Sequence, residues 1–127
     1  MTSVLLDTSI LIHAQRNRAF ALGLDDFSDA LVISRIAACE LIYGSRDKKE
    51  KNVNRLVTQL FKVIEVNEAI SKRAFLLIDQ YGLKTRLGIS DALIAATAIE
   101  EDLVLWTLNT KHFEMIEEVE LFTSKAS

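Results

Sequence analysis

Three carboxylates in this sequence stand beside apolar segments, where a cation could draw them together. Asp7 ends an apolar run, Glu40 lies on the apolar face of a helical segment, and Asp91 opens an apolar stretch. Buried carboxylates are unfavourable unless they are paired, hydrogen-bonded or metal-bound, and acids that converge raise one another's pKa values. A divalent cation removes that conflict, and all-oxygen ligation suits Mg²⁺ or Mn²⁺. Such an ion activates water and stabilises charge on a phosphodiester, so phosphodiester hydrolysis is the leading chemistry.

Each acid also has an ordinary structural interpretation. Aspartate is common as a helix cap, so Asp7 could cap a helix, and Asp91 could favour the dipole of a helix capped by Ser90. Glu40 could form a salt bridge with a nearby arginine. We favour a shared cation site because all three acids follow a strand or open a helix among apolar neighbours.

Four further side chains could support the acids or contact a substrate. Thr8 and Ser9 could steady Asp7 or a metal-bound water, or they could cap a helix. Thr107 could hydrogen-bond to an acid or simply end a strand. Arg86 could contact a phosphate group or pair with an acid.

The elements that must position these residues are short apolar strands alternating with helices. Strands are expected at 4–6, 30–34, 63–66, 103–107 and 119–122. Helices are expected at 10–16, within 16–29, and at 35–44, 53–62, 67–82 and 91–102, with a turn and short helix at 109–116. Asn67 is the expected cap of one helix, and Gly44 and Gly82 are expected helix ends. Strands that are apolar throughout favour a parallel sheet covered on both faces, with ligands outside the carboxyl ends of the strands.

The composition indicates a single globular domain over residues 1–127. Hydrophobic residues make up 50% of the chain and charged residues 26%, which is typical of an ordered protein. The net charge of −3 argues against general, polycation-type binding of nucleic acid. No apolar run reaches ~20 residues, no secretory signal is evident, and the single cysteine fits a reducing compartment. We therefore expect a cytoplasmic protein without a membrane segment.

Four blocks of the sequence resemble the PIN domain. They are Val-Leu-Leu-Asp7-Thr-Ser, Ala-Cys-Glu40-Leu-Ile-Tyr-Gly, Ile-Ser-Asp91-Ala-Leu-Ile-Ala-Ala-Thr-Ala and Thr107-Leu-Asn109-Thr-Lys-His-Phe113. Their order and spacing look like those of the VapC-type ribonuclease toxins of bacterial and archaeal toxin–antitoxin pairs, over essentially the whole chain. The resemblance implies a three-layer α/β/α fold with a mainly parallel sheet of about five strands.

The resemblance also implies a chemistry and a site. It implies endonucleolytic cleavage of RNA that depends on Mg²⁺ or Mn²⁺, with water as the nucleophile and Asp7, Glu40 and Asp91 as the metal-binding acids. Many family members have an aspartate near the position of Asn109, and the neutral asparagine is a weaker ligand that more often positions a water or a backbone group. Whether the site holds one metal or two therefore stays open.

The partners implied by the resemblance are RNA, a second copy of the chain and an antitoxin. The cognate antitoxin of such a toxin often places an arginine or another basic group in the acidic pocket. The complex of toxin and antitoxin would bind operator DNA mainly through the antitoxin. From apolar surface alone, segments 10–22 and 53–62 are the candidate interfaces.

Other residues with chemical potential receive structural interpretations. His112 could act as a general base, but Phe113 beside it favours packing or a surface position. Four more residues are assigned to structural, core or interface positions: His13, Cys39, Tyr43 and Trp106. The charged run 46–51 could guide RNA, but it is more typical of a solvated helix face.

Three competing functions are weighed against the nuclease. A receiver domain would need a phosphoacceptor aspartate after the third strand, and that strand ends in Glu65-Val66-Asn67. A phosphatase with an Asp-x-Asp motif is excluded because Ser9 occupies the place of the second acid. The remaining alternative is a catalytically weak PIN-fold binding module that acts through its antitoxin partner.

Overall fold

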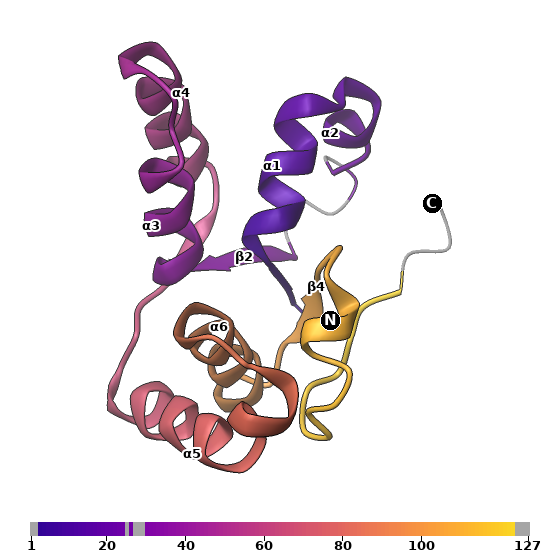
Figure 1. Cartoon of the computed structure of the whole chain (residues 1–127). Helices are drawn as coiled ribbons and strands as arrows, with labels where there is room; N and C mark the ends of the chain where they lie inside the picture. The colour runs from indigo at the N-terminus through magenta and orange to yellow at the C-terminus, as the bar shows by residue number, and fades with distance from the viewer. Residues whose placement is uncertain (1–2, 25, 27–29, 124–127) are drawn as a thin grey trace.

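Helices cover both faces of a small central sheet in the computed structural model of the chain, which describes residues 3–24, 26 and 30–123 (Figure 1). The strands are β1 Val4–Leu6, β2 Leu31–Ser34, β3 Lys62–Ile64 and β4 Val104–Trp106. The helices are α1 Thr8–Arg16, α2 Arg18–Leu24, α3 Arg35–Tyr43, α4 Lys48–Gln59, α5 Glu68–Thr85, α6 Ile89–Glu100 and the short 3₁₀ helix η2 Thr110–His112. None of the described helices is long and apolar enough to cross a membrane.

The sheet is parallel, with its four strands in the order β3-β2-β1-β4. The central strand β1 therefore lies between β2 and β4, and the residues after these strands meet at one edge. This confirms the predicted α/β class and the parallel sheet.

The expected fifth strand at 119–122 is reduced to one parallel bridge, between Leu105 and Leu121. Leu105 donates its N–H to the carbonyl of Glu120 and accepts from the N–H of Phe122. The segment still buries its apolar side chains: Val119 and Leu121 pack against one core, and Phe122 packs against the other.

The two hydrophobic cores lie on opposite faces of the sheet. Leu5 belongs to the core under α5 and α6, whereas Val4 and Leu6 belong to the core under α1 to α4. Figure 1 shows the same division, with α5 and α6 below the sheet and the α1–α2 and α3–α4 pairs above it. This alternation along a single strand produces the predicted three layers.

Helix α6 is buried almost all round, as its composition predicts. Its interior positions are mostly alanine, so it packs closely between the sheet and α5. The predicted cap Ser90 is wrong: Gly88 is the N-cap residue, and the helix begins at Ile89. Asp91 nevertheless lies in the first turn, with its carboxylate at the carboxyl edge of the sheet.

Several predicted boundaries move by a few residues. Helix α4 begins at Lys48, well before 53, because the side chain of Asp47 accepts a hydrogen bond from the N–H of Glu50. Helix α5 begins after the predicted cap Asn67 but continues through Gly82 to Thr85. Strand β3 ends at Ile64, two residues before the predicted end.

Candidate active site

Asp7 is the most buried acid of the predicted site, at 4% exposure. It occupies the N-cap position of α1, yet its side chain caps nothing. Instead, its Oδ2 accepts hydrogen bonds from Ser9 Oγ at 2.9 Å and from Thr107 Oγ1 at 2.7 Å. The helix-cap interpretation of Asp7 is therefore wrong, and the two hydroxyls that the sequence offered as supports do contact this carboxylate.

Glu40 projects from α3 toward the start of α1. The hydroxyl of Thr8 donates a hydrogen bond to Glu40 Oε1 at 2.6 Å, so the residue after Asp7 is tied to the second acid. Glu40 is half-buried. The described residues include no salt bridge from Glu40 to an arginine, in contrast to its ordinary structural interpretation.

Asp91 is half-buried and close enough to Asp7 for their charges to interact. Burial raises the pKa of the Asp91 carboxyl above its ordinary value, and the negative charge of Asp7 raises it further. His112 opposes these effects, because its Nδ1 lies 3.2 Å from Asp91 Oδ2. The ionisation of Asp91 therefore depends on both Asp7 and His112.

The contact of His112 with Asp91 is the feature of the site that sequence reasoning missed. The sequence favoured a packing or surface position for His112, and its side chain is indeed 57% exposed, but the structure also places its imidazole against Asp91. Its place in the block 107–113, directly after strand β4, was the available signal, since residues after parallel strands gather at one edge.

Among the residues that the structure describes, each of the three acids is contacted through one carboxylate oxygen. Within the described ranges, hydrogen bonds and ion pairs reach only Oδ2 of Asp7, Oε1 of Glu40 and Oδ2 of Asp91. Carboxylate oxygens are the donor type that Mg²⁺ or Mn²⁺ prefers, so the chemistry of these side chains fits either ion. No three His, Cys, Asp or Glu side chains in the part of the chain described here stand together as a ready ligand group for one ion. Their common ligation of a metal stays a prediction.

The remaining candidates lie outside this cluster of contacts. Arg86 is exposed at the left-handed end of α5, and none of the described ion pairs joins it to an acid. Asn109 is exposed and contributes its backbone N–H, which donates to Thr107 Oγ1 at 2.9 Å. Cys39 is exposed, so its assignment to the core is wrong. Tyr43 is exposed, which leaves the interface interpretation of the two offered for it, and Trp106 is buried as expected.

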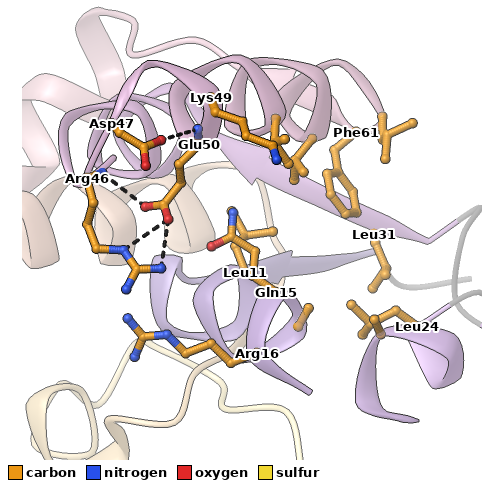
Figure 2. A pocket seen from close by; sticks show the side chains of 15 residues that line it. Leu11, Gln15, Arg16, Leu24, Leu31, Arg46, Asp47, Lys49, Glu50 and Phe61 are labelled. Carbon is orange, nitrogen blue, oxygen red and sulfur yellow. Dashed lines mark hydrogen bonds and ion pairs between the residues drawn. The ribbon is translucent and has the colours of Figure 1, made fainter. Parts of the chain in front are cut away.

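A groove of about 790 Å³ separates the α1–α2 pair from the α3–α4 pair (Figure 2). Its floor is apolar, with Leu11 from α1 and Leu31 from β2, and residues of both predicted interface segments line it. Figure 2 shows Arg16 and Arg46 at the same end of the groove. Glu50 is bound to Arg46 at this end, and the pKa of Glu50 is lowered mainly by the hydrogen bond from the side chain of Arg46 and also by the charge of Arg16.

Known proteins share this architecture and sequence pattern. Ribonuclease VapC10 of Mycobacterium tuberculosis is 41% identical over 90 residues, which make up 70% of this chain and 67% of that protein. A chain in a toxin–antitoxin complex from Klebsiella pneumoniae is 31% identical, with a TM-score of 0.76 over 92% of this chain and 95% of its own length.

A chain of VapBC2 from Rickettsia felis, bound to a DNA fragment from their promoter, is 25% identical. It matches with a TM-score of 0.80 over 96% of this chain and 98% of its own length. The family described as the PIN domain matches residues 4–118, a range that includes all four strands and the three acids. The chain therefore belongs to the PIN-domain family.

Proposed function

We propose that this protein is the toxin of a toxin–antitoxin pair and cleaves RNA as a metal-dependent endoribonuclease. The observation that supports the proposal is the set of contacts at the carboxyl end of the sheet, where Thr107 binds Asp7, Thr8 binds Glu40 and His112 lies against Asp91. Among the described residues, these contacts reach one oxygen of each acid. The ribonuclease and toxin–antitoxin relatives supply the class of substrate and the biological role.

Asp7 and Asp91 are the residues that would hold the ion directly. Mg²⁺ keeps several of its waters and needs only one or two carboxylates, so the pair is sufficient. The bound ion, Mg²⁺ or Mn²⁺, would supply an activated water and stabilise charge on the phosphodiester. Glu40, whose Oε1 is fixed by Thr8, would orient that water with its other oxygen. The exposed Arg86 and Asn109 would contact the RNA backbone from the rim.

The decisive experiment measures RNA cleavage with Mg²⁺, with Mn²⁺ and with a chelator. Wild type should cleave with either ion and stop with the chelator, and Asp7→Asn and Asp91→Asn should lose at least about 100-fold in rate. Asp79→Asn is the matched control, because Asp79 is an exposed acid on α5. If the two site variants cleave as fast as wild type, the site assignment fails.

The same experiment separates the enzyme from the non-catalytic alternative. If wild type cleaves no RNA with either ion but still binds an antitoxin, the binding-module function is supported. Growth is a second readout: expression without the antitoxin should arrest growth, and Asp7→Asn should relieve the arrest.

The groove is the proposed docking surface for the antitoxin. It is lined by apolar residues from segments 10–22 and 53–62, which suits an amphipathic helix of the partner. A basic side chain of the partner could then approach the acids, since α1 runs from the site to the groove. We also propose a homodimer, and binding of operator DNA through the antitoxin, in keeping with the promoter-bound relative. Sedimentation of the purified toxin would establish its oligomeric state.

A further inference from the structure

One short segment of the chain contacts two of the three acids at the same time. At its beginning, Thr107 Oγ1 donates to Asp7 Oδ2 at 2.7 Å. At its end, His112 Nδ1 lies 3.2 Å from Asp91 Oδ2. The segment 107–112 therefore spans the gap between the two aspartates that would hold the ion.

The backbone of this segment is fixed by its own hydrogen bonds. The N–H of Asn109 donates to Thr107 Oγ1 at 2.9 Å, and the N–H of His112 donates to the carbonyl of Asn109 at 3.0 Å. Directly after His112, the side chain of Phe113 is 0% exposed in the core beneath α5 and α6. The distance between the hydroxyl and the imidazole is thus set mainly by backbone and core packing.

The chemistry of the imidazole contact defines which oxygen of Asp91 is engaged. The oxygens of an ionised carboxylate only accept, so this contact suits the imidazole with its proton on Nδ1. The contact engages Oδ2 and leaves Oδ1 for another ligand. The same holds for Asp7, because Ser9 and Thr107 both donate their hydroxyl hydrogen bonds to Oδ2. These bonds leave Oδ1 of Asp7 for another ligand.

A purely structural role does not account for His112. Its side chain is 57% exposed, and its ring contact with Phe113 is long, with centroids 6.4 Å apart. Burial of the imidazole therefore contributes little to stability, and the contact with Asp91 is its main polar interaction among the described residues.

We propose that His112 is a positioning residue which, with Thr107, sets the spacing and orientation of Asp7 and Asp91 for a divalent ion. The inference rests on the proposed function for the identity of the ion. Partners of this kind, which orient metal ligands without touching the metal, typically change metal affinity by about 10- to 100-fold when they are removed.

The test measures Mn²⁺ binding to the full chain by calorimetry, separately from RNA cleavage. His112→Ala should raise the dissociation constant for Mn²⁺ by about 10-fold, with the melting temperature nearly unchanged. His112→Asn should restore most of the affinity, because its amide nitrogen can donate from nearly the position of Nδ1. Lys111→Ala is the matched control, as an exposed neighbour on the same short helix.

Cleavage kinetics give a second readout that a structural role would not move. In His112→Ala the Mn²⁺ concentration needed for half-maximal rate should rise, whereas the KM for RNA at saturating Mn²⁺ should stay at the wild-type value. Thr107→Val should weaken Mn²⁺ binding as well, and the double variant should lose less than the two single losses combined, since both act on one ion.

Three results would overturn the proposal. The first is an unchanged Mn²⁺ affinity in His112→Ala, and the second is an equal loss of Mn²⁺ affinity in His112→Ala and Lys111→Ala. The third is a raised KM for RNA in His112→Ala with an unchanged Mn²⁺ concentration for half-maximal rate, which would show that His112 contacts the substrate. Failure of the proposed function would give a different result from failure of this inference. Wild type would then bind Mn²⁺ more tightly than His112→Ala and yet cleave no RNA.

Discussion

Asp91 is the residue whose ionisation the fold disturbs most clearly within the site. Burial raises the pKa of its carboxyl, the charge of Asp7 adds to the effect, and His112 only partly offsets it. A carboxyl with a raised pKa binds protons more readily in the folded chain than in the unfolded chain. Without metal, stability therefore falls as the pH rises from the ordinary value of 3.8 through the raised value.

Asp91→Asn should remove this pH-dependent penalty. In a chelator, the variant should melt at a higher temperature than wild type at neutral pH, and the difference should shrink as the pH falls toward about 4. Calorimetric melting of both proteins across this range measures the effect, with Asp79→Asn as the exposed control. A difference between the proteins that is the same at every pH would contradict the explanation.

Thr8 supports the site through a single hydroxyl, and removing this hydroxyl should lower the rate of RNA cleavage. Thr8→Val keeps the shape of the buried side chain and deletes the donor to Glu40 Oε1. The cleavage rate should fall by about 10-fold, in line with other partners that orient the acids of a metal site. Thr8→Ser keeps the hydroxyl and should stay near the wild-type rate in the same assay; equal rates for valine and serine would remove Thr8 from the site.

At the scale of elements, one buried amide joins three helices. Asn54 of α4 is 2% exposed, and it donates to the carbonyl of Leu41 at 3.0 Å and to Ser45 Oγ at 2.8 Å. Its carbonyl accepts from Gln15 Nε2 of α1. These bonds hold the α3–α4 pair against α1, beside the groove.

Asn54→Leu should lower the free energy of unfolding by about 1–3 kcal/mol, because it leaves several partly buried polar groups without a partner. Urea unfolding measures this loss. Asn52→Ala lies on the exposed side of the same helix and should change stability by less than about 0.5 kcal/mol. If the two variants were equally stable, the amide would not be joining the helices.

The element types were predictable because their periodicities are local. Apolar runs indicate the strands, and the alanine-rich composition after Asp91 indicates a buried helix. The start of α4 was missed because a charged capping arrangement around Asp47 begins it, without any apolar residue. The segment 119–122 was predicted as a strand but forms a single bridge. An apolar run indicates burial, but it does not show how many backbone hydrogen bonds the segment forms with a neighbouring strand.

In the candidate site too, some features follow from local sequence and others depend on long-range packing. The three acids were inferred from their types and from their places after a strand, within a helix and at a helix start, and their shared role stays a prediction. The contact between Thr107 and Asp7 joins residues 100 positions apart, and no local pattern shows such a pairing. The contact of His112 with Asp91 depends on the same long-range packing, as does the exposure of Cys39 on α3.

In the molecule as a whole, helix α1 links the acids to the groove, and α3 precedes the helix that forms the opposite wall. Helix α1 begins at Thr8 beside the acids and ends at Arg16 at the rim of the groove. Helix α3 carries Glu40 and leads into α4, which forms the opposite wall (Figure 2). A partner seated in the groove would therefore contact α1, the helix that begins beside the acids.

This arrangement allows binding of the antitoxin to be separated from catalysis. Val53 lines the groove from α4, away from the three acids, and is half-exposed. Val53→Glu should place an uncompensated charge in the buried centre of the complex and weaken antitoxin binding by about 30-fold or more, the loss typical of a central interface residue. The rate of RNA cleavage by the isolated toxin should stay unchanged.

Calorimetric titration with the cognate antitoxin measures the affinity, and growth on co-expression measures its consequence. Leu83→Glu is the matched control, because Leu83 is a fully exposed apolar residue on α5 outside the groove. Val53→Glu should stop growth even with the antitoxin present, whereas Leu83→Glu should be neutralised like wild type. If Val53→Glu binds the antitoxin normally, the partner docks on another surface. If the isolated Val53→Glu variant loses RNA cleavage, a change in the groove on α4 also affects the site, and the two functions cannot be separated there.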